Sequence, residues 1–160
     1  MNKIGFIGGG NMAEALLKGI LEAGLYHPEQ IWVSDICIER LDFLRRTYGV
    51  RASGDNRAAA GNVGMLILSV KPQQMASVLA EIATAVKDGT IVVSIAAGIR
   101  TSKIRAILPN VQIIRVMPNM AVMAAAGASA LYNAGASQEA MEEVLAVFNS
   151  VGKTVVVDQE

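Results

Sequence analysis

Three consecutive glycines, Gly8, Gly9 and Gly10, stand between an apolar run and a stretch rich in helix-forming residues. Glycine loses more conformational freedom on folding than any other residue, so a cluster of it here needs a reason. The spacing Gly8-x-Gly10-x-x-Ala13 fits a turn from a strand into a helix whose free N–H groups face a diphosphate. Gly8 would permit the tight turn, Gly10 would admit a phosphate, and Ala13 would allow close helix packing. The pattern indicates nucleotide binding; a plain flexible turn is the alternative.

An acidic residue follows where such a nucleotide site expects one. Asp35 lies 22 positions (35 − 13) after Ala13, directly behind the apolar run Ile31–Ser34. Its carboxylate would accept a hydrogen bond from a ribose 2′-hydroxyl, which favours NAD(H). The alternative is a cap for a helix that starts near Ile38. NADP(H) would instead need cations or hydroxyls, so both cofactors stay open. The candidates for that role are Ser34, Arg40 and Arg57.

Three further segments end expected strands with residues suited to a cleft. They are Lys71-Pro72, Ala96-Ala97-Gly98 and Met117-Pro118-Asn119. Pro72 favours an extended conformation at Lys71, and small side chains leave room for a flat ring against the backbone. Taken alone, each segment is typical of the ordinary end of a strand. Because the carboxyl ends of parallel strands share one sheet edge, together they predict one cleft beside the glycines.

The elements that must position these residues alternate in type along the chain. Strands are predicted at Lys3–Ile7, Ile31–Ser34, Val50–Ala52, Met65–Val70, Thr90–Ile95, Gln112–Val116, Ala128–Tyr132 and Lys153–Val157. Helices are predicted at Asn11–Ala23, Ile38–Tyr48, after Asp55, and at Gln73–Val86, Thr101–Leu108 and Gln138–Asn149. In the second helix, Ile38, Leu41 and Leu44 share one side. The order predicts an α/β fold: a Rossmann-type, doubly wound, mostly parallel sheet with helices on both faces, in one domain over residues 1–160.

Composition excludes several classes of function. The 160 residues carry 14 basic and 14 acidic side chains, and no basic stripe points to nucleic acid. No signal-peptide pattern and no membrane-length apolar run is present, so a cytoplasmic protein is expected. The single cysteine, Cys37, fits a reducing compartment and is expected to be a buried or half-buried thiol. The single histidine, His27, precedes Pro28 and indicates a surface turn, so no metal site is expected.

At the residues described above, the sequence resembles the pyrroline-5-carboxylate reductases, which complete proline biosynthesis. The matching segments, in family order, are IGFIGGGNMAEALLKGIL, VSD, GDN, LSVKPQQM, VVSIAAGI, RVMPN and SVGKTVVVDQE. The resemblance spans essentially the whole chain. It implies hydride transfer from NAD(P)H to the C=N carbon of 1-pyrroline-5-carboxylate, giving L-proline. Such a reaction suits a site with few acid–base groups, because the cofactor supplies the difficult step.

The resemblance also implies the residues of the site. Those for the cofactor are Gly8, Gly10, Asn11 and Met12 at the pyrophosphate, Ser34, Asp35 and Asn56 at the adenosine, and Ser69, Val70, Lys71, Pro72, Ala96, Ala97 and Gly98 at the nicotinamide. Those on the substrate side are Met117, Pro118 and Asn119. No catalytic side chain is expected within this chain.

Two departures from the family pattern bear on function. After Asn119 the family usually continues with Thr-Pro, whereas this chain has Met120-Ala121. The helical C-terminal domain that in the family forms the dimer and most substrate contacts would lie beyond Glu160. The 160 residues alone are therefore expected to form negligible proline, and the apolar segment Met120–Ala126 is a candidate surface for self-association. Two alternatives remain: a stand-alone dinucleotide-binding or regulatory module, and another imine or deazaflavin-linked reductase, told apart by residues 34–40.

Overall fold

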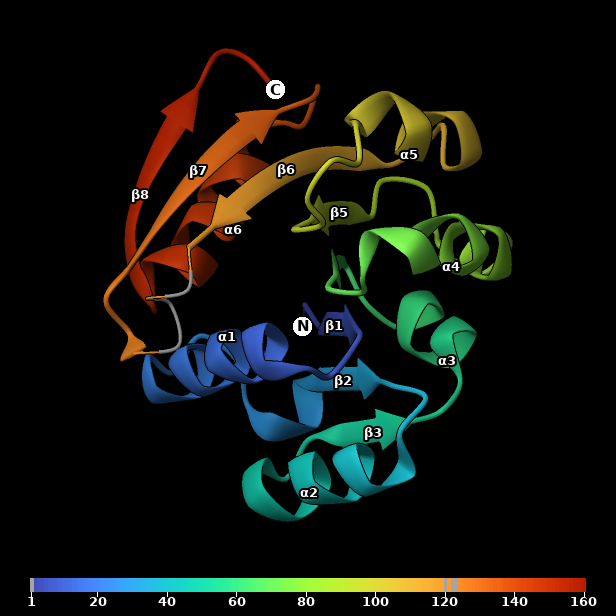
Figure 1. Ribbon diagram of the computed structural model, residues 1–160, viewed down its shortest axis with the longest axis vertical. Helices are drawn as coiled ribbons and strands as arrows, with labels where there is room; N and C mark the ends of the chain where they lie inside the picture. Colours follow the sequence, from blue (N-terminus) through green and yellow to red (C-terminus); the bar gives the residue numbers. More distant parts are fainter. Residues whose placement is uncertain (1, 120, 122–123) are drawn as a thin grey trace.

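The computed structural model describes residues 2–119, 121 and 124–160, in which one sheet runs through the whole molecule. Its strands are β1 (Ile4–Ile7), β2 (Ile31–Ser34), β3 (Arg51–Ser53), β4 (Met65–Leu68), β5 (Ile91–Ser94), β6 (Gln112–Pro118), β7 (Gly127–Asn133) and β8 (Gly152–Val157). Their order across the sheet is β3-β2-β1-β4-β5-β6-β7-β8 (Figure 1). Neighbouring strands are parallel except β6 and β7, which run antiparallel. Successive strands are added on one side of β1 up to β3 and on its other side from β4 onward, because β2 and β4 both pair with β1.

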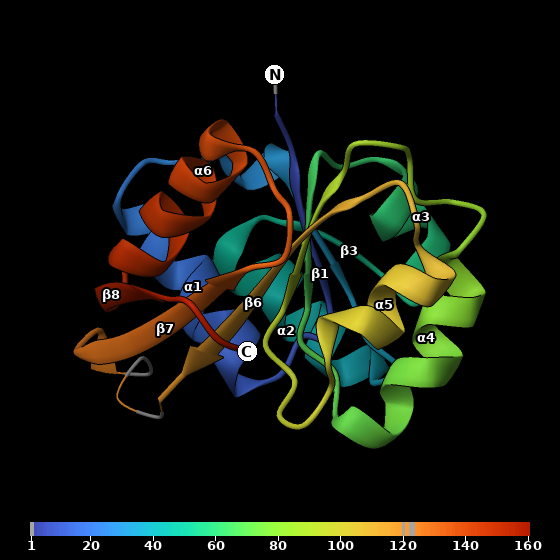
Figure 2. The ribbon, with the colours of Figure 1, turned by 90° about the horizontal axis from the view of Figure 1, so that it is seen from above.

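Helices cover both faces of this sheet. They are α1 (Asn11–Glu22), α2 (Ile38–Tyr48), α3 (Asn56–Gly61), α4 (Met75–Ile82), α5 (Thr101–Ile107) and α6 (Gln138–Asn149), with short 3₁₀ turns η1 (Pro28–Gln30) and η2 (Pro72–Gln74). Side chains of α1, α2 and α6 pack into one core cluster, and those of α3, α4 and α5 into another. Figure 2 shows α1 and α6 on one side of the sheet and α3, α4 and α5 on the other. The predicted doubly wound α/β fold is confirmed.

The central strands are apolar without interruption because both of their faces are covered. In β1, Ile4 and Phe6 pack toward α1 and α6, while Ile7 packs toward α4. Phe6 is fully buried beside Val33 of β2 and Ile67 of β4 in the strand register. The carboxyl ends of β1, β2 and β4 are therefore held rigidly side by side.

Two elements end two or more residues earlier than the sequence predicts. β4 stops at Leu68 rather than Val70, because its neighbours β1 and β5 end at Ile7 and Ser94, the residues paired with Leu68. The following helix comprises η2 and then α4, which ends at Ile82 instead of Val86. The residues between β4 and η2 are consequently free to border a cavity.

The structure corrects the predicted burial of two side chains near the start of α2. Ile38 was expected on the inner side of its helix with Leu41 and Leu44, but it is 70% exposed while those two are buried. Cys37 was expected to be buried or half-buried, and it is exposed. Cys37 is the N-cap of α2 and Ile38 is its first residue, so both stand at the exposed start of the helix, ahead of the buried Leu41 and Leu44. His27 is exposed at the start of η1.

The segment 120–127 is described in part. Met120, Val122 and Met123 lie outside the described residues, and they are three of the seven residues of the patch predicted there for self-association. Gly127 already belongs to β7. Across the rest of the chain, no helix has the length and apolar character to cross a membrane.

Candidate nucleotide-binding site

The three glycines of the turn differ in what a side chain at each position would contact. Gly8 has a positive φ of +98°, and a Cβ there would lie 2.6 Å from the carbonyl oxygen of Ser69. A Cβ on Gly9 would lie 2.9 Å from Leu44 Cδ1. Gly10, which precedes α1, has an ordinary φ of −72°, and a Cβ there would meet no atom within 4 Å. The fold therefore requires glycine at position 8 and a small residue at position 9, whereas Gly10 leaves open space outside the turn.

Asp35 connects the glycine turn to the end of β2. Its Oδ2 accepts a hydrogen bond from Gly9 N at 2.7 Å, and its Oδ1 accepts one from Cys37 N at 2.9 Å. The carboxylate thus holds the turn in place as well as bordering the cavity described below. Its expected bond to a ribose hydroxyl stays a prediction, and a carboxylate with further lone pairs has the capacity to make it.

Arg40 supports the glycine turn from the solvent side, a role that sequence reasoning missed. Its guanidinium donates to the carbonyl oxygens of Gly9 and Gly10 and pairs with the carboxylate of Glu14. Tyr48 donates to the other oxygen of that carboxylate at 2.7 Å. With the two carbonyls held outward, the turn keeps its N–H side toward the cleft. No local pattern links residues 26 positions apart, so the sequence carried no signal for this network.

The network shifts the ionisation of its members. Burial raises the pKa of Glu14, but hydrogen bonds from Tyr48 and Arg40 outweigh it and bring the pKa below its usual 4.5. Burial and the neighbouring Glu14 carboxylate raise the pKa of Tyr48 to about 12. Glu14 is therefore the charged acceptor and Tyr48 the neutral donor around neutral pH, which keeps Arg40 in place.

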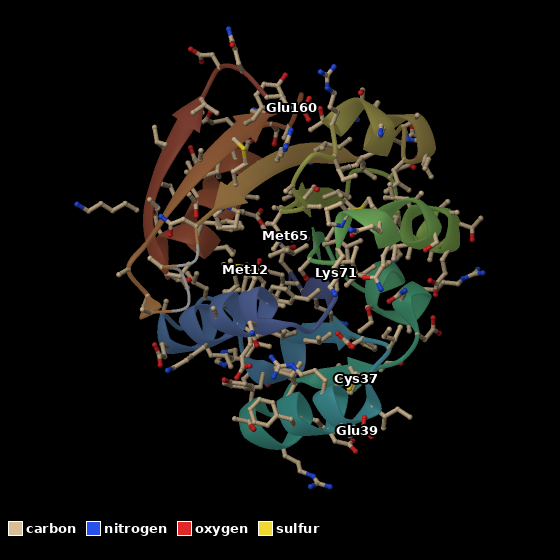
Figure 3. All side chains as sticks on the ribbon, viewed as in Figure 1. Met12, Cys37, Glu39, Met65, Lys71 and Glu160 are labelled. Atoms are coloured by element: carbon tan, nitrogen blue, oxygen red, sulfur yellow. The ribbon has the colours of Figure 1, made fainter. Side chains whose placement is uncertain are left out.

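Two cavities lie on either side of the segment 69–71. The Asp35 cavity, of about 300 Å³, is bordered by Ile7, Gly8, Gly10, Asp35, Ile36, Asn56, Gln74, Ser77, Val78 and Glu81. The Pro72 cavity, of about 250 Å³, is bordered by Met12, Pro72, Ile95, Ala96, Ala97 and Pro118. Both also include Ser69, Val70 and Lys71. In Figure 3, Met12 and Lys71 are labelled near the middle of the molecule, beside the glycine turn.

Most of the predicted site residues thus lie together at one edge of the sheet. Five of them border neither cavity: Asn11, Ser34, Gly98, Met117 and Asn119. Ser34 is fully buried, and its hydroxyl contacts Asn56 Oδ1 at 2.7 Å. The Oδ1 of Asn119 accepts from the backbone N–H groups of Ala121 and Ala128, so this side chain shapes the connection to β7.

The residues Gln74, Ser77 and Glu81 border the Asp35 cavity although no motif singled them out. Their spacing of three and four residues places them on one face of η2 and α4. That spacing, counted onward from Lys71-Pro72, was the signal available in the sequence. Glu81 accepts a hydrogen bond from Asn56 Nδ2 at 2.8 Å, which ties α4 to α3 across the cavity wall.

The Pro72 cavity is poor in acid–base groups. Lys71 is its only ionisable lining residue among those that the structure describes. The Ser69 hydroxyl is bonded to the backbone carbonyl oxygens of Ile7 and Gly8, and the remaining lining side chains are apolar. In the described part of the chain, no cluster of three or more histidines, cysteines or carboxylates is placed to hold a metal ion. The arrangement can bind and orient a flat ring, and proton transfer by a positioned base is not built into it.

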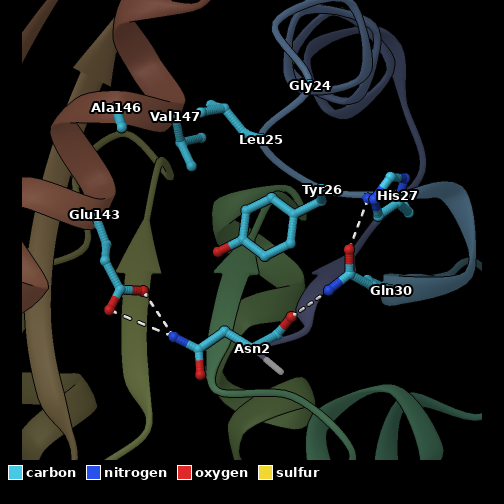
Figure 4. A pocket seen from close by; sticks show the side chains of 9 residues that line it. All are labelled: Asn2, Gly24, Leu25, Tyr26, His27, Gln30, Glu143, Ala146 and Val147. Carbon is cyan, nitrogen blue, oxygen red and sulfur yellow. Dashed lines mark hydrogen bonds between the residues drawn. The ribbon is translucent and has the colours of Figure 1, made fainter.

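A larger cavity, of about 430 Å³, lies at the opposite edge of the sheet, between α6 and residues 24–27, which follow α1 (Figure 4). Asn2 Nδ2 donates to Glu143 at 3.3 Å, and Gln30 bonds the backbone of both His27 and Asn2. Burial and the nearby Glu143 raise the pKa of Tyr26 to about 12. These polar groups satisfy one another at the amino end of β1. Because open α/β sheets bind nucleotides at the carboxyl ends of their strands, this cavity is not the nucleotide site.

Comparisons with known proteins agree with this geometry. Residues 3–98 match the model of a family described as NADP oxidoreductase, coenzyme F420-dependent. The chain is similar to the pyrroline-5-carboxylate reductases of Methanosarcina acetivorans, 38% identical over 159 residues, and of Escherichia coli, 35% identical over 157 residues. These alignments cover 98% and 97% of this chain but 59% and 58% of the relatives.

Solved structures extend the same comparison. A pyrroline-5-carboxylate reductase from Coxiella burnetii superposes with a TM-score of 0.94 at 33% identity, over 99% of this chain and 60% of that one. A pyrroline carboxylate reductase from Plasmodium falciparum, with NADP bound, superposes with a TM-score of 0.81 at 23% identity, which bears on the fold alone. The resemblance seen in the sequence is confirmed, and the chain spans about three fifths of the length of these relatives.

Proposed function

The chain belongs to the family described as NADP oxidoreductase, coenzyme F420-dependent, and from that premise we propose that it is the dinucleotide-binding part of a pyrroline-5-carboxylate reductase. The reaction would be hydride transfer from NAD(P)H to 1-pyrroline-5-carboxylate, giving L-proline. The observation that carries the proposal is the meeting of the glycine turn with two cavities at one edge of the sheet. The family's description names NADP, which confirms the nicotinamide dinucleotide expected from the sequence, and the preference of this chain for NADH or NADPH stays a prediction.

The backbone at the start of α1 would hold the diphosphate. The first N–H groups of a helix have no partner within the helix, and its dipole favours an anion there. Gly9 N already donates to Asp35, so the donors left to the diphosphate come from Gly10, Asn11 and Met12. Nothing covers the Cβ side of Gly10, which lets the phosphates approach closely.

The two cavities would hold the two ends of the cofactor. The Asp35 cavity would take the adenosine, with Asp35 and Asn56 facing the ribose. The Pro72 cavity would take the nicotinamide, whose ring would lie against the small residues Ala96 and Ala97. When bound, the nicotinamide supplies the hydride. The apolar walls of the Pro72 cavity exclude water from one face of the ring and orient the other.

Direct titration tests the binding part of the proposal. NADH and NADPH are added separately to the purified chain, and binding is followed by nicotinamide fluorescence and calorimetry. We expect dissociation constants on the order of micromolar, which corresponds to about 8 kcal/mol of binding free energy. Failure of both cofactors to bind below about a millimolar (about 4 kcal/mol) to the folded chain would refute the site.

Activity is tested in a chimera, because this chain covers 58% of the Escherichia coli relative. Residues 1–160 replace the matching segment of that enzyme, and proline formation is measured with the reduced cofactor and 1-pyrroline-5-carboxylate. We expect turnover in the chimera and negligible turnover in the 160 residues alone. A chimera that folds and binds cofactor but forms no proline would favour a module without turnover.

A second candidate is a reductase that uses a deazaflavin, which the family's description favours by naming coenzyme F420. The residues that separate the two candidates are those around Asp35, because a ribose hydroxyl there identifies an adenine dinucleotide. Adding coenzyme F420 as a third arm of the titration decides between them. Binding of coenzyme F420 in place of both nicotinamide cofactors would support the second candidate.

The proposal extends to compartment and assembly. A cytoplasmic location agrees with the single, exposed thiol of Cys37. Self-association is supported by the exposed apolar side chains Val155 and Val156 on the edge strand β8. Light scattering of the purified chain measures the assembly, and a strictly monomeric chain at all concentrations would argue against this surface.

A further inference from the structure

We propose that Glu81 is a specificity-determining residue of the nucleotide site: its carboxylate disfavours a 2′-phosphate and so favours NADH over NADPH. The inference rests on the proposed function, since it concerns the ribose of the same cofactor. It goes further by assigning the choice of cofactor to a side chain of α4 that no sequence motif marks.

A chain of hydrogen bonds links Glu81 to the end of β2. The hydroxyl of Ser34 contacts Asn56 Oδ1 at 2.7 Å, and Asn56 Nδ2 donates to Glu81 Oε2 at 2.8 Å. The amide of Asn56 is thus engaged at both ends, and it positions the carboxylate of Glu81. In this fold, the ribose of the adenosine binds where β2 ends. The Asn56 side chain therefore connects Glu81 to the end of β2, beside which a 2′-phosphate would have to bind.

The charges around this cavity oppose a phosphate. Among the described residues that border the Asp35 cavity, the ionisable ones are Asp35, Glu81 and Lys71. Lys71 borders the Pro72 cavity as well, and it is the single cation beside two carboxylates among these residues. Asp35 follows β2 directly, and Glu81 is linked to Ser34 of β2 through Asn56, so both carboxylates belong to the β2 side of the cavity.

The nearby arginines are directed elsewhere. Arg40 pairs with Glu14 and with the carbonyls of the glycine turn. Arg57 borders neither cavity, and its Nη2 donates to Thr84 Oγ1 at 3.1 Å. A 2′-phosphate carries about 1.5 to 2 negative charges at neutral pH. It would meet two carboxylates there, without an arginine directed at it.

The exposure of Glu81 sets the expected size of its effect on cofactor preference. Glu81 is exposed at the rim of the cavity, so solvent and salt screen its charge. For a single charge facing a dianion at such a site, we expect discrimination of about three- to tenfold. The discrimination should shrink as the ionic strength rises, since exposed charges are screened within about 10 Å at 0.1 M salt.

The variant Glu81→Gln tests the inference because it removes the charge and keeps an oxygen that can accept from Asn56. Dissociation constants for NADH and NADPH are measured at low and at high salt. We expect NADPH to bind the variant about three- to tenfold more tightly and NADH to change less than about twofold. Glu142→Gln is the matched control, because Glu142 is an exposed carboxylate on α6 that bonds Gln138 away from the cavity.

Each outcome has one meaning. A shift in the NADPH to NADH ratio in Glu81→Gln, absent from Glu142→Gln, supports the inference. If both cofactors bind and the ratio is unchanged, Glu81 does not determine specificity while the proposed function stands. If Arg57→Gln weakens NADPH selectively and Glu81→Gln changes nothing, the arginine binds the phosphate and the inference is overturned. If neither cofactor binds the unmodified chain, the proposed function itself fails.

Discussion

Substituting Gly10 separates ligand binding from folding more sharply than any other change at the glycine turn. In Gly10→Val the new side chain points into open space, and φ of −72° suits every residue type. The cost to the fold is that of a poorer residue at the helix N-cap, about 0.5–1 kcal/mol. For a chain of this length that corresponds to a fall in Tm of roughly 1–4 °C.

Binding should fall much further than stability. The valine side chain would occupy the space through which a diphosphate approaches the N–H groups at the start of α1. We expect affinity for NADH and NADPH to drop at least about a hundredfold, or about 2.7 kcal/mol. Titration gives the dissociation constants, and thermal unfolding of the same samples gives the stability. A Gly10→Val protein that binds either cofactor within about threefold of the unmodified chain would refute the placement of the diphosphate.

Gly8→Ala is the matched contrast. A Cβ at position 8 would lie 2.6 Å from Ser69 O, on a backbone with φ of +98°. Strain of this kind costs about 1–3 kcal/mol, and the clash with backbone adds to it. The two variants should therefore differ in what they lose: Gly8→Ala should lose mainly stability, and Gly10→Val should lose mainly affinity for the cofactor. Equal losses of stability in both would mean that Gly10 is also required by the fold.

The network behind the glycine turn yields three further tests. Arg40→Gln should weaken NADH and NADPH to the same degree in titrations, because it loosens the turn that both share; a selective loss of NADPH would instead assign Arg40 to the 2′-phosphate. Tyr48→Phe should lower the free energy of unfolding by about 1 kcal/mol, measured by urea titration, since one hydrogen bond to a carboxylate is lost; an unchanged midpoint would contradict the bond. The folded state lowers the pKa of Glu14, so its contribution to stability is present above about pH 4.5 and is lost as the pH falls further. In the Glu14→Gln variant, stability measured at decreasing pH should lack that loss. The same fall in stability at acid pH in the variant and the unmodified chain would count against the network.

The sequence predicts the fold and the edge of the site because both depend on local patterns. Uninterrupted apolar runs identify buried strands such as β4, and the glycine spacing identifies the turn into α1. The sequence did not predict the exposure of Ile38, because helical periodicity indicates which side of a helix is apolar but not which of its residues extend beyond the sheet. The contacts of Arg40 with Glu14 escaped it as well, because they join elements far apart in the chain.

Asp35 shows why cofactor choice in this site is divided between two carboxylates. Sequence reasoning offered it as either a ribose ligand or a helix cap, and in the structure its carboxylate holds Gly9 N and Cys37 N. Replacing Asp35 to admit a 2′-phosphate would therefore also free the glycine turn, and affinity for every dinucleotide would suffer. Glu81 accepts only from Asn56 among the described hydrogen bonds, so its charge can change without moving the turn. Specificity can thus vary at Glu81 independently of the backbone that holds the diphosphate, and this independence predicts a change in ratio without a loss of NADH binding.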